Sequence, residues 1–422
     1  MQLQEQEDHD YTRTRVPENK TVSGFKIATV LASISLTLPV FYLGSQVSLS
    51  LGLAKASSVF MGVSFVLSLL CIVTGIIGNR ARLSAYMLLH YSFGKKGVMV
   101  INALIAISLL GWYAVTLEVF GVAITDSLQS IFNVHFPTWA AIIIGSALMT
   151  STAVFGFKSV ERFSIIVIPI KLIFVFFVLY VTTQQSSLTT ILSIPGNGSM
   201  SMRECISAIM GTSILAPILM PDCTRFARKD KDSIIAVLGI IIGFPLVLFA
   251  GGIPSLVTGE VDIMKIMTGI GLTIPALIII IFLGAWTTNS VNLYDTQLTI
   301  STLFTKTKAI KLGIIASATG TVLALLGVTT YFISFLDFSN IFFPPVSAIF
   351  IAHYAFVSDR KFDIADFDKL PNFDYTAIFS WFIGSMVALL ANYHFITITT
   401  VSFFDSFFVG FIIYVLLKKY WK

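Results

Sequence analysis

The sequence has 422 residues, of which 56% are hydrophobic and only 12% are charged, and its formal net charge is +5. Water-soluble domains carry about 25% charged residues, so this composition excludes an ordinary soluble globule. No basic run exceeds a few residues, which excludes a nucleic-acid partner, and three cysteines are too few for a disulfide framework. Apolar stretches near the roughly 20 residues that span a bilayer recur along the chain, which predicts an all-α polytopic membrane protein.

Residues 1–25 are polar and mixed in charge, and they lack the apolar core of a signal peptide. We therefore expect them to form a disordered cytoplasmic N-terminal tail. Twelve apolar spans are predicted after this tail, at residues 26–48, 56–78, 97–123, 138–156, 162–184, 202–222, 232–255, 275–303, 310–328, 330–356, 374–391 and 397–417.

The positions of the basic residues support twelve spans. With the N-terminus in the cytoplasm, 23 of the 27 basic residues fall in inside segments and one, Lys171, lies within a span. Only Lys55, Arg203 and Lys265 fall outside. Because cytoplasmic loops carry an excess of Lys and Arg, we expect a multi-pass protein of the cell membrane with both termini in the cytoplasm.

Prolines interrupt two spans in corresponding positions. Pro39 lies in the first span, and Pro217 and Pro221 lie in the sixth. Proline removes a backbone donor, and paired interrupted helices are typical of transporters built from inverted repeats. The predicted division is a first repeat at 26–184, a second repeat at 202–356, and two further helices at 374–417.

The stretch "LGAWTTNSVNLYD" places unusual hydrogen-bonding capacity inside the eighth span. Thr287 and Thr288 offer two adjacent hydroxyl oxygens, and carbonyls around Ser33 and Leu36 in the interrupted first span would offer more. Unwound carbonyls coordinate Na⁺ in folds of this kind. The alternative is that each Thr hydroxyl bonds to its own helix.

Two large side chains lie near the centre of other spans. Trp112, in the third span, is away from the membrane interface, and we interpret it as a stacking surface for a flat ligand or as a packing residue. Lys171, in the fifth span, needs an acceptor or must lose its proton. Either state is compatible with proton coupling or with a fixed positive charge in place of a bound cation.

The remaining charges near the membrane are predicted to have ordinary roles. Glu118, Asp295 and Asp405 lie toward span ends, where water can reach them. We expect Asp222 to cap a neighbouring helix or to pair with Arg225. No phosphate-binding loop or other enzyme motif is present, so the sequence predicts a gradient-driven transporter and not an enzyme.

Five motifs occur in order along roughly residues 30 to 360: "HYSFGKKG", "GWYAV", "DCTRFARK", "WTTNSVNLYD" and "FFPPVSAIFIAHY". They resemble the nucleobase–cation symporter-1 family, the purine and cytosine permeases, and most of all its bacterial cytosine permeases. The resemblance implies a 5+5 inverted-repeat (LeuT-like) core with broken helices 1 and 6. It also implies one planar substrate between spans 1, 3, 6 and 8 and a sodium ion between spans 1 and 8.

Site residues follow from the resemblance by position. The implied sodium ligands are the carbonyls of Ser33, Leu36 and Gly284 and the hydroxyls of Thr287 and Thr288. The implied substrate contacts come from Trp112, Leu109, Thr37, Thr212, Ser213 and Asn289.

The chain departs from cytosine permeases in its pocket. Leu109 stands where they have a Gln, Leu36 and Thr37 replace paired Phe residues, and Ser213 replaces another Phe. A purine or another nitrogen heterocycle is therefore as plausible as cytosine. Lys171 is a further departure, because some sodium-independent transporters of this architecture have a lysine in the fifth span.

The leading prediction is a symporter that imports a nucleobase-like heterocycle with Na⁺ by alternating access. The alternatives are proton (H⁺) coupling through Lys171, and an amino-acid or amine carrier of the same fold. No cofactor is expected beyond the coupling ion. The expected partners are the substrate and the lipid bilayer, and nothing in the sequence requires more than a monomer.

Overall fold

The computed structural model describes residues 11, 14–154, 157–279, 285–304, 306–393 and 395–420. Within them the chain forms helices joined by loops, and the strand-like pairing is one isolated bridge between Val22 and Ala227. The N-terminal third of the described chain contains η1 (Glu18–Lys20), α1 (Gly24–Ser35), α2 (Leu38–Leu51), α3 (Leu53–Ala81), α4 (Ala85–Phe93) and α5 (Gly97–Phe132).

The middle of the chain continues with α6 (Thr138–Ala153), α7 (Phe157–Gln185), α8 (Leu188–Ser193), α9 (Met202–Ser213), α10 (Leu215–Thr224), α11 (Asp230–Ala236), α12 (Leu238–Ile241), α13 (Gly243–Thr258), α14 (Ile263–Gly269) and α15 (Ile274–Ile279). The last part contains α16 (Thr287–Leu303), α17 (Ala309–Leu325), η3 (Val328–Tyr331), α18 (Phe332–Phe342), α19 (Pro344–Phe356), η4 (Ile364–Lys369), α20 (Tyr375–Asn392) and α21 (Ser402–Tyr420).

Length and hydropathy identify the membrane-crossing segments. Among the described residues seven segments are long and apolar enough to cross a membrane, and the bent pair α1–α2 makes an eighth. Helices α6 and α17 are apolar but shorter. The multi-pass helical architecture agrees with the sequence, while the number of twelve spans stays a prediction.

The predicted break in the first span lies at Leu36 and Thr37. There α1 and α2 meet at an angle of 62°, and Pro39 lies in the first turn of α2. Proline suits this position, since the first turn of a helix has no intrahelical acceptor for its N–H groups. The break also changes local pairing, because the Thr37 N–H donates to the Ser35 carbonyl, which leaves the Ser33 carbonyl without its usual helical donor.

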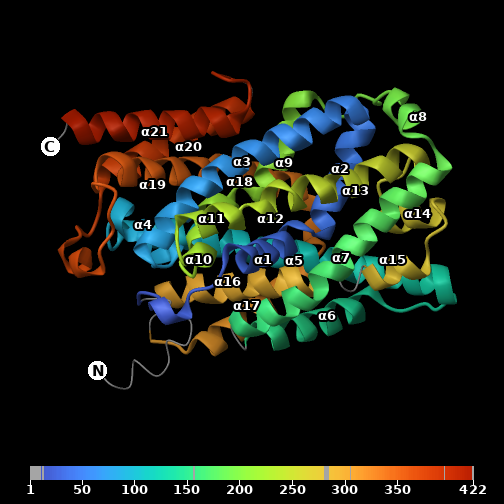
Figure 1. Ribbon diagram of the computed structural model, residues 1–422, viewed down its shortest axis with the longest axis horizontal. Coiled ribbons are helices and arrows are strands. Elements are labelled where there is room, and N and C mark those ends of the chain that lie inside the picture. The colour runs from blue at the N-terminus through green and yellow to red at the C-terminus, as the bar shows by residue number, and fades with distance from the viewer. Residues whose placement is uncertain are drawn as a thin grey trace.

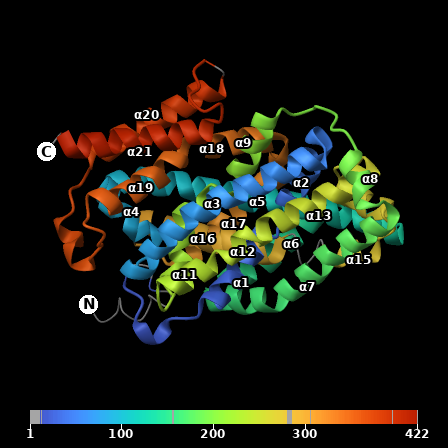
Figure 2. The same cartoon turned by 45° about the horizontal axis from the view of Figure 1, so that its top comes forward.

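Two groups of helices face each other across the molecule (Figure 1). In the first group, α2 packs along α13, α3 along α10, and α1 against α11 and α12. In the second group, α5 packs against α16, α6 and α17. Helix α7 contacts both groups, through α1 and α13 on one side and α16 on the other. Helices α20 and α21 pair with each other at the edge of the bundle (Figure 2).

Glycines allow helices α2 and α13 to cross in close contact. A Cβ atom at Gly44 would collide with the Leu248 carbonyl, and one at Gly251 would collide with the Phe41 carbonyl. Small residues permit such backbone contact inside a membrane. This crossing fixes α2, and therefore one side of the break, against the first group.

One end of the bundle carries the described N-terminal segment, α4 and the C-terminal end of α21 (Figure 1). We call it the terminal end. The N-terminal segment is tied to it by backbone hydrogen bonds, from the Val16 N–H to the Arg82 carbonyl and from the Val22 N–H to the Phe226 carbonyl. Val16 is buried, so the prediction of disorder is wrong for residues 14–22 of the tail, which pack against the helix bundle.

Candidate functional site

A cavity of about 150 Å³ lies between the two groups of helices. It begins at Thr37 in the α1–α2 break and extends toward Arg225 at the terminal end of α10. This volume is small against the roughly 300–1,000 Å³ of drug-sized sites, and it suits a single small ring. Its wall includes Val30, Ser35, Thr37, Leu109, Trp112, Thr116, Thr212, Ser213, Phe244, Thr288, Asn292 and Asp295.

Lys171 reaches from α7 into the α1–α2 break. Its ammonium donates to the carbonyl oxygens of Ser33 and Leu36, each at 3.1 Å, and to the hydroxyl of Thr287 at 2.7 Å. The Thr288 hydroxyl donates to the same Ser33 carbonyl at 3.2 Å. An ammonium has three donors and no acceptor, so three acceptors satisfy it completely in a place where the side chain is 1% exposed.

The groups predicted to bind sodium thus come together around a lysine. Ser33, Leu36, Thr287 and Thr288 meet as expected, and Gly284 lies outside the described residues. A sodium ion among these oxygens would face a second positive charge, and two like charges 4 Å apart repel by about 4 kcal/mol at an effective dielectric constant of 20. The site therefore does not fit a sodium ion beside the protonated lysine, and the sodium assignment stays a prediction.

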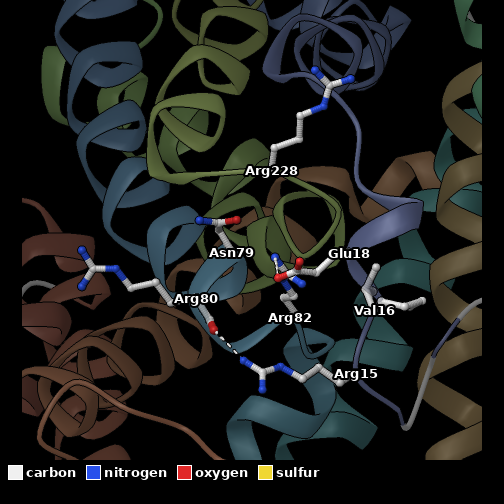
Figure 3. A pocket seen from close by; sticks show the side chains of 8 residues that line it. Arg15, Val16, Glu18, Asn79, Arg80, Arg82 and Arg228 are labelled. Carbon is white, nitrogen blue, oxygen red and sulfur yellow. Dashed lines mark hydrogen bonds and ion pairs between the residues drawn. The ribbon is translucent and has the colours of Figure 1, made fainter.

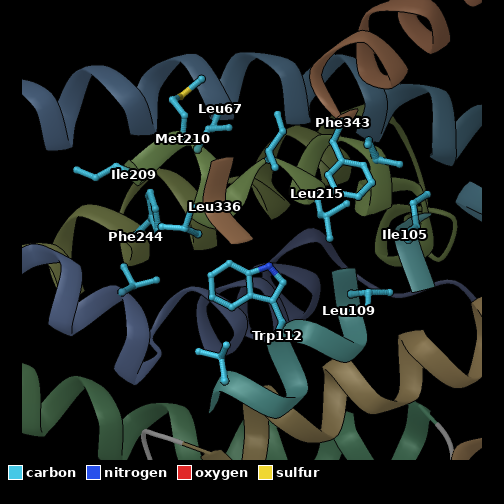
Figure 4. Packing of buried hydrophobic residues seen from close by; sticks show 14 of the residues in the cluster. Leu67, Ile105, Leu109, Trp112, Ile209, Met210, Leu215, Phe244, Leu336 and Phe343 are labelled. Atoms are coloured by element: carbon cyan, nitrogen blue, oxygen red, sulfur yellow. The ribbon is translucent and has the colours of Figure 1, made fainter. Parts of the chain in front are cut away.

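Trp112 forms part of the cavity wall on α5, one turn after Leu109 (Figure 4). Its indole packs edge-on against Phe332 and Phe335, with ring centroids 5.9 and 5.3 Å apart and interplanar angles of 82° and 75°. Such contacts fix the plane of the indole. The structure therefore brings both predicted α5 residues to the cavity and holds Trp112 in one orientation.

The interrupted sixth span also reaches the cavity. Thr212 and Ser213, at the end of α9, line it together with Thr37. The Thr212 hydroxyl donates to the Ile209 carbonyl at 2.7 Å, while the buried Thr37 hydroxyl has no hydrogen-bond partner among the described residues. The Thr37 hydroxyl can therefore form a hydrogen bond with a molecule in the cavity.

Asn289 does not lie in the cavity wall. Its amide nitrogen donates to the Tyr113 carbonyl at 2.9 Å and contacts the Met149 sulfur at 3.3 Å, and its side chain is fully buried. Its amide oxygen accepts from Asn292 at 3.3 Å. Asn289 thus links α16 to α5, whereas Asn292 lines the cavity.

Helical spacing in α16 explains which polar residues face the cavity. The wall takes Thr288, Val291, Asn292, Tyr294, Asp295 and Leu298 from this helix, and all of these except Tyr294 form a stripe at i, i+3, i+4, i+7 and i+10. Residues at these intervals share one face of a helix. The sequence analysis missed Asn292, and counting from Thr288 would have found it.

The cavity ends in charged side chains at the terminal end. The Asp222 carboxylate accepts from the Ala85 N–H, the first residue of α4, at 3.1 Å, which confirms the predicted capping role. The Arg225 guanidinium donates to the backbone carbonyls of Asp222, at 3.2 Å, and of Tyr11, at 2.9 Å. Asp295 lines the same end from α16.

Known proteins resemble this chain over nearly its whole length. A family model described as "Permease for cytosine/purines, uracil, thiamine, allantoin" matches residues 15–414. Cytosine permease of Escherichia coli (strain K12) is 24% identical over 383 residues, which cover 90% of this chain and 88% of that protein.

Solved structures share the fold. Mhp1, a nucleobase-cation-symport-1 family transporter, in a closed conformation with bromovinylhydantoin bound, has a TM-score of 0.84 at 15% identity over 98% of this chain and 95% of its own. The inward-facing conformation of Mhp1 has a TM-score of 0.82 at 15% identity, over 96% and 92%. A Na⁺-coupled sialic acid symporter has a TM-score of 0.65 at 15% identity, over 97% and 90%. The LeuT-like fold is therefore confirmed, and the chain is a transporter that belongs to the family of permeases for cytosine and purines, uracil, thiamine and allantoin.

Proposed function

We propose that this permease carries a planar nitrogen heterocycle of nucleobase size by alternating access, and that Lys171 takes the place of a coupling sodium ion. The substrate class rests on the family and on the cavity. The cavity wall contains the indole of Trp112 and the Thr37 hydroxyl, which has no hydrogen-bond partner among the described residues. Trp112 would stack on the ring, and Thr37, Asn292 and the end of α9 would offer hydrogen bonds to its edge.

Transport without sodium is supported by one observation, the three hydrogen bonds from Lys171 to Ser33, Leu36 and Thr287. The ammonium connects the broken first span to α16, which belong to opposite groups of helices. A fixed positive charge can hold the break in this way without a bound ion. The driving force that remains for accumulation is a proton gradient.

The test is uptake into proteoliposomes of labelled cytosine, uracil, adenine, guanine, hypoxanthine and allantoin, with an amino-acid mixture as the comparison for an amine carrier. Each is supplied once with a sodium gradient and once with a proton gradient in sodium-free buffer. We expect one heterocycle to accumulate with protons alone. Accumulation that requires sodium would support sodium-coupled symport instead. Uptake of amino acids alone would contradict the substrate class.

Removing the lysine separates the two ion assignments further. Lys171→Ala leaves the oxygens of Ser33, Leu36, Thr287 and Thr288 without the ammonium, and oxygens of this kind are what Na⁺ binds. We expect Lys171→Ala to lose proton-driven uptake and to gain stimulation by sodium. Adding Thr287→Val, which removes one oxygen, is the matched control and should abolish the gain. Sodium stimulation of the wild type would contradict the proposal.

The orientation and the repeat boundaries belong to the same proposal. We place the terminal end in the cytoplasm, with repeats at 26–184 and 202–356. Four arginines, Arg15, Arg80, Arg82 and Arg228, line a surface pocket of about 510 Å³ at this end (Figure 3), in keeping with the positive-inside rule. Single cysteines introduced at Lys20 and at Lys265 should react with an impermeant maleimide from opposite sides of the membrane. Labelling from the same side would contradict this topology.

A further inference from the structure

Two carboxylates lie in the cavity wall with too little positive charge to balance them. Asp222 on α10 and Asp295 on α16 both line the cavity, at the end where Arg225 also lies. One oxygen of Asp222 accepts from Ala85, while the other is buried and has no hydrogen-bond partner among the described residues. Asp222 itself is 8% exposed.

Arg225 is engaged elsewhere. The hydrogen bonds of its guanidinium go to the backbone carbonyls of Asp222 and Tyr11. Among the described residues, the ion pairs within 4.0 Å do not include one from Arg225 to either carboxylate. With both carboxylates ionised, the cluster therefore carries one net negative charge where Asp222 is buried and Asp295 is partly buried, which is costly.

The neighbouring titratable groups do not compensate for that charge. The hydroxyl of Tyr86, from α4, donates to the Asp295 backbone carbonyl at 3.4 Å. Cys223, on α10, and Tyr294, on α16, line the cavity with the two carboxylates. Tyrosine and cysteine side chains are neutral at pH 7, so among the described residues that line the cavity Arg225 is the one cation beside the pair.

We propose that Asp222 and Asp295 form a proton-binding carboxylate pair in the wall of the transport cavity. One carboxylate takes up a proton to become a carboxylic acid, whose O–H then donates to the other carboxylate or to the substrate. Two like-charged carboxyl groups that share a site hold one proton for the same reason in aspartic proteases. The free oxygen of Asp222 is the acceptor that such a proton would satisfy.

A proton suits the pair better than a metal ion. Among the described residues no group of three or more His, Cys, Asp or Glu side chains could hold a metal. The inference rests on the proposed function in one respect, because that proposal gives Lys171, with its hydrogen bonds to Ser33, Leu36 and Thr287, the role of a fixed charge. The proton that drives transport must then bind at another group.

The position of the pair suggests how its proton would act. Asp222 belongs to α10 in the first group of helices, and Asp295 belongs to α16 in the second. Two negative charges push these groups apart and favour an open terminal end, whereas one shared proton turns repulsion into a hydrogen bond and favours closure. Substrate and proton occupy one cavity, so each would change the affinity of the other by the same factor.

Infrared difference spectroscopy on the purified full-length protein tests the pair without a known substrate. The sample is titrated from high to low pH, and the carbonyl stretch of a protonated carboxyl group is identified by its shift in D₂O. We expect a band that appears near neutral pH and that is lost from this pH range in both Asp222→Asn and Asp295→Asn. Either variant leaves one carboxylate without a repelling neighbour, so its protonation moves to lower pH. Asparagine at position 222 keeps an oxygen acceptor for the Ala85 N–H, and Asp295→Asn serves alone if Asp222→Asn does not fold.

The matched control is Asp337→Asn, which changes a carboxylate in a separate cavity and should leave the band in place. A band that survives in both pair variants would overturn the inference, and so would a band that sodium chloride removes and choline chloride does not, since the pair would then bind a metal cation. Uptake by the wild type tests the proposed function separately. A neutral-pH band without uptake would support the carboxylate pair and contradict the proposed function. Uptake without the band would support the proposed function and contradict the pair.

Discussion

The two proline-interrupted spans respond differently to the same chemical defect. The first span bends by 62° between α1 and α2, whereas the segment from Met202 to Thr224 still qualifies as one span and is not among the pairs bent by more than 40°. Pro39 removes the helical donor to the Ser35 carbonyl, and Pro217 removes the donor to the Ser213 carbonyl. Proline alone therefore does not set the size of the break.

What faces each interruption accounts for the difference. In the first span the buried ammonium of Lys171 donates to the carbonyls of Ser33 and Leu36. Beside Ile214, in the sixth span, the Thr212 hydroxyl donates back to its own helix. A proline permits a helix to open, and a charged partner from another helix stabilises the open form.

The largest expected effect is the loss of this charged partner. Lys171→Met should remove the ammonium donor from the Leu36 carbonyl and the Thr287 hydroxyl, while the Ser33 carbonyl keeps the Thr288 hydroxyl. We expect the free energy of unfolding to fall by about 3 kcal/mol, since each buried group left unpaired costs roughly 1–3 kcal/mol. Thr212→Val, at the other interruption, should cost about 1 kcal/mol or less. Thermal unfolding of the two variants in the same detergent measures the contrast. Equal shifts in melting temperature would mean that the lysine does not stabilise the break.

Substitution of Trp112 tests whether the cavity, which both interruptions line, binds the substrate. Trp112→Phe keeps an aromatic side chain next to Phe332 and Phe335 but reduces the stacking surface. Aromatic stacking contributes about 0.5–1.5 kcal/mol beyond burial, so we expect substrate affinity to fall about threefold to tenfold while thermal stability changes little. Equilibrium binding of the transported heterocycle is the measurement, and Phe335→Leu, which removes a supporting ring, is the control for altered packing. Unchanged affinity in Trp112→Phe would assign Trp112 to packing.

The smallest effect distinguishes two asparagines of α16. Asn292→Ala should weaken substrate binding about fivefold, the loss of one hydrogen bond of about 1 kcal/mol, with little change in unfolding. Asn289→Ala should lower stability instead, because it removes the link to the Tyr113 carbonyl. Comparing binding with melting temperature for both variants decides between them. If Asn289→Ala weakened binding and left stability unchanged, the substrate contact first predicted for Asn289 would be restored.

Much of the site could be predicted from residue types and spacing. Proline marked the break in the first span, and paired threonines pointed to the oxygens that meet it. Trp112 and Leu109 lie on one face of α5 as expected. The asparagines show the limit of such reasoning, because a choice between neighbouring polar residues depends on the helix rotation, which is set by packing against α5 and α6.

The sequence by itself determined the membrane location, the helical architecture and the family, because hydropathy, proline positions and ordered motifs are local properties of the chain. Only the tertiary structure decided what occupies the α1–α2 break and which carboxylates share a cavity. Lys171 is 138 residues from Ser33 and 116 from Thr287 along the chain, and α10 approaches α16 only across the interface of the two helix groups. Such contacts depend on how distant helices pack, and no local pattern of residues specifies them.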